Sequence, residues 1–120
     1  MENTILDLEK NLFKYEYISK KEWLDNVIHE CFTECGKSGY LYKKEDTIES
    51  LLTCNEDRNI VIYNYTCKQI DEHTWLVHYI TTTDETNLIY RTSIWVKEDN
   101  LKLIFHQATK YNENITLERF

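Results

Sequence analysis

The sequence predicts an α+β fold in which helices cover one face of an antiparallel sheet. Three observations favour this class. The first third of the chain carries apolar residues at helical spacing, the second half carries runs of β-branched and aromatic residues, and short polar turns separate those runs. The 120 residues indicate one domain, spanning 1–120, with a single core.

The N-terminal region is predicted to contain two helices. Apolar side chains recur at helical spacing through residues 4–17, from Ile5 to Tyr15. The segment Ser19–Glu22 has the residue types and spacing of a capping box, which predicts that a second helix begins there. The aromatic side chains of this region either fill the core or border a cavity; those concerned are Phe13, Tyr17 and Trp23.

The middle of the chain is predicted to form a short strand, a turn and a third helix. Residues 30–35 alternate in character, with Phe32 and Glu34 on one face. The turn at 36–39 is a Gly-x-x-Gly segment that lacks the spacing of a phosphate-binding Walker loop. The helix over 42–52 is expected to turn its aliphatic residues inward, namely Ile48, Leu51 and Leu52.

Four strand-like runs make up the second half of the chain. Residues 59–70 are rich in β-branched and aromatic types. Residues 74–83 alternate, so that one face carries Trp75, Val77, Tyr79 and Thr81. The segment 90–109 folds into a hairpin, because Asp99–Asn100 tolerates the left-handed backbone of a tight turn.

A two-residue loop at Asp99–Asn100 sets the expected register of this hairpin. It pairs Val96 with Leu103, Trp95 with Ile104, Ser93 with His106 and Arg91 with Ala108. One face is then mostly apolar and suits packing: Tyr90, Thr92, Ile94, Val96, Leu103, Phe105 and Gln107. The other face has the mixed character of a ligand pocket: Arg91, Ser93, Trp95, Ile104, His106 and Ala108.

Composition excludes several classes of partner. A formal charge of −7 without a basic patch argues against binding to nucleic acid or to an anionic membrane. No apolar run approaches the roughly 20 residues of a membrane span. The N-terminal residues lack the features of a signal peptide, so we expect a cytoplasmic protein.

The four cysteines are expected to be ordinary thiols in a reducing compartment. Cys31 and Cys35 lie near His29, which is the one suggestion of a metal site. There is, however, no Cys-x-x-Cys pair and no second pair of ligands. We therefore predict neither a metal nor a cofactor.

Two segments of the chain resemble a known family. The first is His29-Glu-Cys-Phe-Thr-Glu-Cys-Gly-Lys-Ser-Gly39, similar to the family pattern His-x-x-Phe-x-Glu-x-Gly-x-Ser-Gly. The second runs from Arg91-Thr-Ser-Ile-Trp95 to Ile104-Phe-His-Gln-Ala-Thr109, similar to Arg-x-Ser-x-Trp followed by Phe-His-Gln-Gly-Thr. The chain thus resembles the bacterial domain-of-unknown-function branch of the nuclear-transport-factor-two-like superfamily, also called SnoaL-like or ketosteroid-isomerase-like.

The resemblance implies a cone: a strongly curved sheet wrapped around the helices and open at one end to a cavity. It implies that the cavity has a polar end made by Arg91, Ser93 and His106. Its wall would be aromatic, formed by Phe13, Tyr17, Trp23, Tyr79 and Trp95. Members commonly pair through the outer face of the sheet, which implies a homodimer through Ile94, Val96, Leu103 and Phe105.

Arg91 and His106 each allow two interpretations. Arg91 either clamps the carboxylate or other anion of a ligand, or forms an internal ion pair, for which Glu34 is the candidate. His106 titrates near neutrality and is either an acid or base for catalysis, or a histidine of the pocket wall that is hydrogen-bonded to Ser93.

Glu34 is the sharpest candidate for catalysis. The resemblance implies this role, because steroid isomerases of the superfamily carry their proton-shuttling carboxylate on this early strand. Burial in an apolar cone would raise its pKa towards neutrality, as a general base requires. Tyr15 or Tyr17 could supply a phenol donor, but the late strands offer no second acid on the pocket face.

Three functions are therefore open. The first is a protein that binds a small organic molecule in the pocket, an anion if Arg91 clamps it. The second is an isomerase, cyclase or hydrolase that uses Glu34 or His106 to transfer a proton. The third is a dimerisation or interaction module with a filled cavity.

Overall fold

The computed structural model describes residues 1–120. The helices are α1 (Glu2–Asn11), α2 (Tyr15–Ile18), α3 (Lys21–Val27) and α4 (Lys44–Leu52). The strands are β1 (Ile28–Cys35), β2 (Leu41–Lys43), β3 (Val61–Asp71), β4 (Thr74–Thr82), β5 (Leu88–Lys97) and β6 (Leu101–Tyr111). None of the helices has the length and apolar character needed to cross a membrane.

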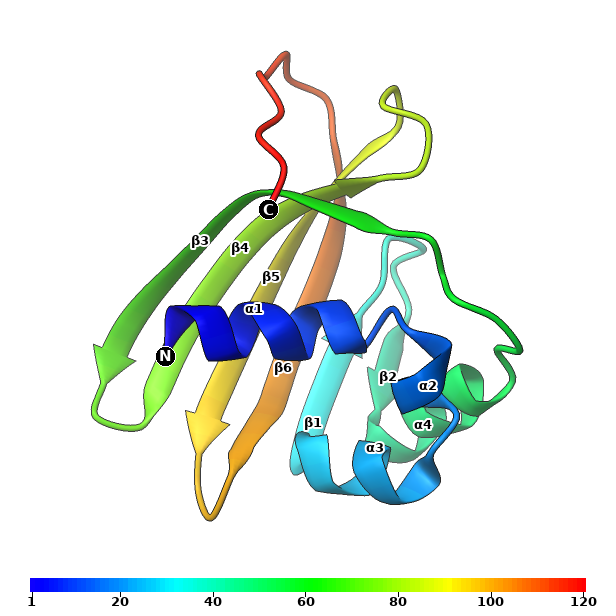
Figure 1. Ribbon diagram of the computed structural model, residues 1–120, viewed down its shortest axis with the longest axis vertical. Coiled ribbons are helices and arrows are strands. Elements are labelled where there is room, and N and C mark those ends of the chain that lie inside the picture. Colours follow the sequence, from blue (N-terminus) through cyan, green and yellow to red (C-terminus); the bar gives the residue numbers. More distant parts are fainter.

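All six strands belong to one sheet, in the order β2-β1-β6-β5-β4-β3. Neighbouring strands are antiparallel except β1 and β6, which run parallel. Helix α1 crosses one face of this curved sheet, and the other helices gather beside β1 and β2 (Figure 1). The predicted α+β class and the curved sheet around N-terminal helices are confirmed, with one parallel contact within a sheet expected to be antiparallel.

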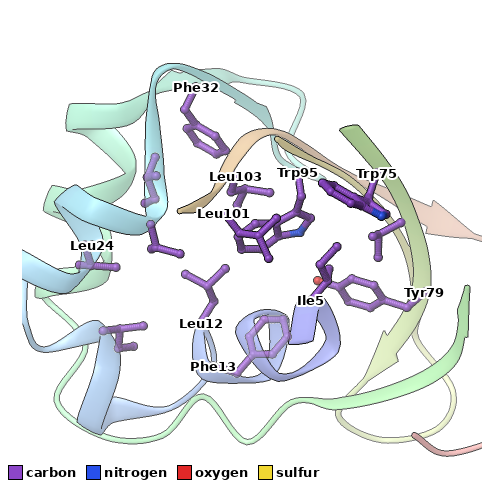
Figure 2. Packing of buried hydrophobic residues seen from close by; sticks show 14 of the residues in the cluster. Ile5, Leu12, Phe13, Leu24, Phe32, Trp75, Tyr79, Trp95, Leu101 and Leu103 are labelled. Atoms are coloured by element: carbon purple, nitrogen blue, oxygen red, sulfur yellow. The ribbon is translucent and has the colours of Figure 1, made fainter. Parts of the chain in front are cut away.

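The core lies between the helices and the face of the sheet that α1 crosses (Figure 2). Ile5 and Leu24 from the helices and Trp95 from β5 are completely buried there. The strand predicted to begin after residue 73 is present, and the residues predicted to share one of its faces are all buried: Trp75, Val77, Tyr79 and Thr81.

The first helix is shorter than predicted. The periodicity suggested one helix over 4–17, but α1 ends at Asn11 and α2 begins at Tyr15. Tertiary hydrogen bonds hold the break open: the backbone N–H of Arg58 donates to the carbonyl of Phe13 at 2.9 Å. The backbone N–H of Tyr15 donates to the carboxylate of Asp57 at 2.7 Å. The break turns Phe13 away from the helical stripe and into the interior.

The predicted capping box at Ser19–Glu22 does not form. Ser19 follows the end of α2, and α3 begins at Lys21 without a side-chain cap. A side-chain hydrogen bond does occur at the start of α4, where the N–H of Lys43 donates to Asp46 at 3.0 Å. Within α4, Ile48 points inward as predicted, whereas Leu52 is exposed because it lies in the last turn.

In the β5–β6 hairpin, the expected register is confirmed in the half farther from the turn. Ser93 pairs with His106 and Arg91 with Ala108, as predicted. Nearer the turn the loop is three residues long, Glu98–Asn100, and a bulge shifts the pairing so that Trp95 lies opposite Leu103.

Because of the bulge, the residues of β6 near the turn lie on the opposite face from the one predicted. Leu103 is only 4% exposed and belongs to the core, so it is wrong as a member of the outer face. Ile104 occupies the bulge and is half-buried. Because the extra residue reverses the alternation, Leu101 and Leu103 point inward on the same face as His106.

Candidate ligand-binding cavity

A cavity of about 510 Å³ lies between the helices and the inner face of the sheet. Its apolar wall is formed by side chains from α1, β1, α4 and β6 and from the residues next to them: Leu12, Phe13, Ile28, Phe32, Leu51 and Leu103. Its volume is within the usual range for small-molecule sites. Gly36, Lys37 and Ser38, from the turn after β1, also line it.

Arg91 extends from β5 into this cavity. Its Nε donates a hydrogen bond of 2.8 Å to the hydroxyl of Thr81, and its Nη1 donates to Nε2 of His106 at 3.3 Å. The guanidinium also lies 5.7 Å from the centre of the Phe13 ring. These contacts hold the arginine in place but do not neutralise its charge.

Arg58 is a second arginine of the cavity, which the sequence did not indicate. It lies in the segment between α4 and β3, and its guanidinium is 5.0 Å from the centre of the same Phe13 ring. Burial and the positive charge of Arg91 lower the pKa of Arg58. The only signal in the sequence is that Arg58 is the sole cationic residue between Thr53 and Ile60.

Neither arginine forms an ion pair. Four salt bridges occur, and all of them involve lysine or histidine: Lys21–Asp25, His29–Glu98, Lys44–Glu30 and His73–Glu72. The suggested ion pair of Arg91 with Glu34 is therefore wrong. Two guanidinium groups share one partly apolar cavity without a contacting carboxylate, which is unfavourable unless another negative group approaches them.

Glu34 lies on β1 and also lines the cavity. It is in register with His106 of β6, so the two candidate catalytic residues sit on adjacent strands. One carboxylate oxygen accepts a hydrogen bond of 3.3 Å from the hydroxyl of Thr47. Burial raises the pKa of Glu34, although Thr47 and the two arginines oppose that shift.

His106 is buried and hydrogen-bonded at both ring nitrogens. Its Nδ1 lies 2.9 Å from the hydroxyl of Ser93, and its Nε2 accepts from Arg91. Burial and the charges of Arg91 and Arg58 lower the pKa of His106 to about 3. The imidazole is therefore neutral at physiological pH, which agrees with the pocket-wall interpretation that includes Ser93.

Glu9 also lines the cavity and was not predicted as a site residue. It is only 1% exposed, yet it lies on α1. The hydroxyl of Tyr79 donates to its Oε1 at 2.5 Å, and the indole N–H of Trp95 donates to its Oε2 at 2.8 Å. The signal was present, because Glu9 follows Ile5 by four residues and precedes Leu12 by three, so it falls on the apolar stripe.

The structure brings together five of the predicted site residues around the cavity: Phe13, Glu34, Tyr79, Arg91 and His106. Ser93 and Trp95 are fully buried behind this wall, where they contact His106 and Glu9 instead of the open space. Tyr17 and Trp23 lie outside the lining and pack against each other, with ring centres 5.2 Å apart.

The cavity has no apparent metal site. No group of three His, Cys, Asp or Glu side chains is close enough together to hold a metal ion. Its charged lining instead consists of three cationic and three acidic side chains beside an apolar wall: Lys37, Arg58, Arg91, Glu9, Glu34 and Asp46.

Comparison with solved structures shows the fold. An NTF2-like protein (nuclear-transport-factor-two-like) from Cytophaga hutchinsonii has a TM-score of 0.64 at 21% identity, with 91% of this chain and 97% of that chain covered. An NTF2-like protein of unknown function in nutrient uptake from Rhodospirillum rubrum gives 0.69 at 14% identity, covering 90% and 98%. A ketosteroid isomerase-like protein from Parabacteroides distasonis gives 0.70 at 11% identity, covering 93% and 89%.

No family model matches the sequence, and no curated protein matches it. The similar structures nevertheless confirm the expected resemblance at the level of the fold. The chain has the NTF2-like cone fold.

Proposed function

We propose that this protein binds a small organic anion in the cavity, with the acidic group of the ligand at Arg58 and Arg91. The observation that carries the proposal is that both guanidinium groups line the cavity and neither has a carboxylate within ion-pair distance. A bound anion would offset their mutual repulsion and form charge-assisted hydrogen bonds with them.

The apolar wall indicates the rest of the ligand. Leu12, Phe32, Leu51 and Leu103 would contact a hydrocarbon or aromatic body, while the arginines hold the charged end. The NTF2-like fold is compatible with this function, since the resemblance implies a cone that opens at one end to a cavity. The class of ligand is therefore a carboxylate, or a similar acid, with an apolar body.

The proposal is tested with matched pairs of acids and neutral amides. Binding of phenylacetate, benzoate and hexanoate is measured by calorimetry beside phenylacetamide, benzamide and hexanamide. At least one acid should bind more tightly than its amide, and Arg91→Gln and Arg58→Gln should each weaken that acid about tenfold or more. Lys97→Gln, an exposed position of β5, is the matched control. The proposal is wrong if every amide binds as well as its acid.

A second candidate function is acid–base catalysis by Glu34. The supporting observation is that its carboxyl group reaches the same cavity, has Thr47 as its hydrogen-bond partner, and has a pKa raised by burial. His106 is less suited to this role at neutral pH, because both its nitrogens are engaged and its pKa is about 3. If Glu34→Gln retained full turnover of an identified substrate, Glu34 would not be the base.

We also propose that two copies associate through the outer face of the sheet. Ile94, Val96 and Phe105 are half-buried on a face that no helix of this chain covers. Beside them, Tyr90 stacks with both His78 and Tyr111, with ring centres 5.4 and 5.7 Å apart. Native mass spectrometry should detect a dimer that Ile94→Lys dissociates, and a wild-type monomer at micromolar concentration would contradict the proposal.

Two further expectations depend on these proposals. An interaction module with a filled cone is less well supported than ligand binding, since the cavity measures about 510 Å³. The proposed location remains the cytoplasm, where reducing conditions suit the four free thiols.

A further inference from the structure

We propose that a second cavity, on the outer side of Phe13, binds the phosphoryl group of a small phosphorylated molecule. This outer cavity has a volume of about 270 Å³ and is lined by residues from the end of α1, the start of β3 and the C-terminal segment. Its volume is just below the usual range for drug-sized ligands, so it suits a smaller molecule. The inference does not depend on the function proposed for the cavity that contains Arg58 and Arg91.

Two short segments of the chain separate the two cavities. In the first segment, Leu12 lines the inner cavity and Lys14 lines the outer one. In the second segment, Arg58 lines the inner cavity and Asp57 lines the outer one. The segments are joined by the hydrogen bond of 2.9 Å from the N–H of Arg58 to the carbonyl of Phe13. Phe13 is the one residue that lines both cavities, so its ring is the wall between them.

Three cations from different parts of the chain line the outer cavity. Lys10 lies in the last turn of α1, Lys14 lies just before α2, and Arg119 lies in the C-terminal segment. None of them forms an ion pair, since the four salt bridges involve other residues. The one acidic side chain of the lining, Asp57, already accepts a hydrogen bond of 2.7 Å from the N–H of Tyr15. In a chain of formal charge −7, this depression with a mostly cationic lining should attract anions.

The position of Arg119 is fixed by the pairing of the C-terminal segment with β3, beside which the C-terminus lies in Figure 1. Asn64 has a left-handed backbone, with φ of 53°, at a bulge in β3. Its N–H donates to the carbonyl of Glu118 at 2.8 Å, and its Oδ1 accepts from the N–H of Glu118 at 2.7 Å. On the other side of Arg119, the N–H of Phe120 donates to the carbonyl of Ile62 at 3.0 Å. The arginine is therefore held between two anchored residues.

The surroundings of the three cations favour a phosphoryl group over a carboxylate. Arg58 lies on the far side of the wall, with its guanidinium 5.0 Å from the centre of the Phe13 ring, and its charge adds to the positive potential. The backbone N–H groups of Asn59 and Ile60, two further lining residues, donate to no backbone carbonyl. A phosphoryl group carries about two negative charges and three acceptor oxygens at neutral pH, so it can use several cations and N–H donors together.

The rest of the lining suits a short organic body. Ile60, Ile62 and Phe120 line the outer cavity together with Phe13. The ring of Phe120 is 41% exposed, although one side of it packs against Tyr65 with ring centres 5.9 Å apart. A ligand whose phosphoryl group lies among the cations can cover these apolar side chains with its remaining atoms. We therefore expect a phosphate ester to bind more tightly than inorganic phosphate.

Titrations followed by ¹H–¹⁵N NMR test the site with inorganic phosphate, phenyl phosphate and phenol at constant ionic strength. Both phosphates should shift the backbone amides of Lys14, Asn59, Ile60 and Arg119, with phenyl phosphate binding more tightly and phenol leaving these amides unchanged. Lys14→Gln/Arg119→Gln should weaken phenyl phosphate about fivefold or more. Both side chains are exposed, so the double variant should fold.

Two controls separate this site from the inner cavity and from a general effect of charge. Lys20→Gln/Lys97→Gln removes the same charge from exposed positions elsewhere and should leave the affinity unchanged. Arg58→Gln/Arg91→Gln removes the cations of the inner cavity and should preserve the shifts of the outer amides. Equal affinities in the Lys14/Arg119 and Lys20/Lys97 variants, or shifts confined to the inner cavity, would overturn the inference. Absence of acid binding to the inner cavity would contradict the proposed function and leave this result unaffected.

Discussion

The indole N–H of Trp95 donates a hydrogen bond of 2.8 Å to the carboxylate of Glu9, joining β5 to α1. Both side chains are buried, at 0% and 1% exposed. This hydrogen bond has one role in the fold and another at the cavity. It fastens the N-terminal helix across the sheet, and it supplies one of the donors that make burial of a carboxylate tolerable.

We expect Trp95→Phe to be strongly destabilising. The substitution removes a donor to a buried carboxylate and leaves a small void, which together cost about 2–4 kcal/mol. Trp23→Phe is the matched control, because Trp23 is half-buried against Tyr17 and makes no hydrogen bond to Glu9; it should cost less than about 1.5 kcal/mol. Urea denaturation of both variants measures the difference, and equal losses would contradict the assigned role of the indole.

Inorganic anions should stabilise the protein through the two arginines. Sulfate, compared with chloride at equal ionic strength, should raise the melting temperature of the wild type more than that of Arg58→Gln/Arg91→Gln. The general salting effect of sulfate acts on both proteins, so only the difference reports binding. At ten times its dissociation constant an anion adds about 1.4 kcal/mol to the free energy of unfolding. Equal shifts would show that the arginines do not attract anions.

The contribution of His106 to the free energy of unfolding should decrease as the pH is lowered. Burial and the nearby arginines lower the pKa of His106 to about 3, whereas a histidine of the unfolded chain titrates near ~6.5. Below the pKa of the unfolded chain, the unfolded protein binds a proton at this histidine and the folded protein does not. The free energy of unfolding of the wild type therefore decreases by up to ~1.4 kcal/mol per pH unit. The stabilising contribution is fully present above the pKa of the unfolded chain, and it is lost as the pH falls towards the pKa of the folded protein.

The comparison with His106→Gln isolates this effect. The buried acids Glu9 and Glu34 have raised pKa values and act in the opposite direction, losing stability as the pH rises, but they are present in both proteins. The advantage of the wild type in urea denaturation should therefore shrink by roughly 2 kcal/mol between pH 6.5 and 5. An advantage that does not depend on pH would contradict the lowered pKa.

The bulge in β6 predicts that alanine substitution destabilises the protein by different amounts at two adjacent residues. Leu103→Ala should cost about 2–4 kcal/mol, because Leu103 is in the core, whereas Ile104→Ala should cost less than about 1.5 kcal/mol at its half-buried position. The regular register predicted from the sequence places Leu103 outside and Ile104 inside, and would give the reverse order. Thermal denaturation of the two variants distinguishes these registers.

This hairpin also shows how far the sequence could predict the fold. Within a single strand, alternation placed Arg91, Ser93 and Trp95 on one face, and the family resemblance implied that this face is the inner one. The structure confirms the assignment for all three. Alternation cannot indicate an extra residue, because Ile104 has the same β-branched, apolar character as its neighbours in a regular strand. The error was therefore confined to the turn-proximal end of β6.

The candidate site was predictable where residues lie on regular strands and not elsewhere. His106 was identified because a strand fixes which side chains share a face, and Glu34 because the resemblance implies a carboxylate on this early strand. Arg58 was missed because it belongs to an irregular segment, whose path depends on tertiary contacts such as the hydrogen bond to Phe13. Glu9 was missed because a charged residue on a helix is usually exposed, and only the donors Tyr79 and Trp95 from distant strands reverse that expectation.

The parallel pairing of β1 with β6 has a consequence for how the chain folds. The strand that carries Glu34 completes its pairing only with the last strand, whereas every other pair in the sheet joins consecutive strands. A contact between segments so far apart in sequence raises the contact order and slows folding. On the ribosome, β1 must wait for β6 to emerge before this edge is paired. During that interval the nascent chain is most exposed to aggregation and most dependent on chaperones.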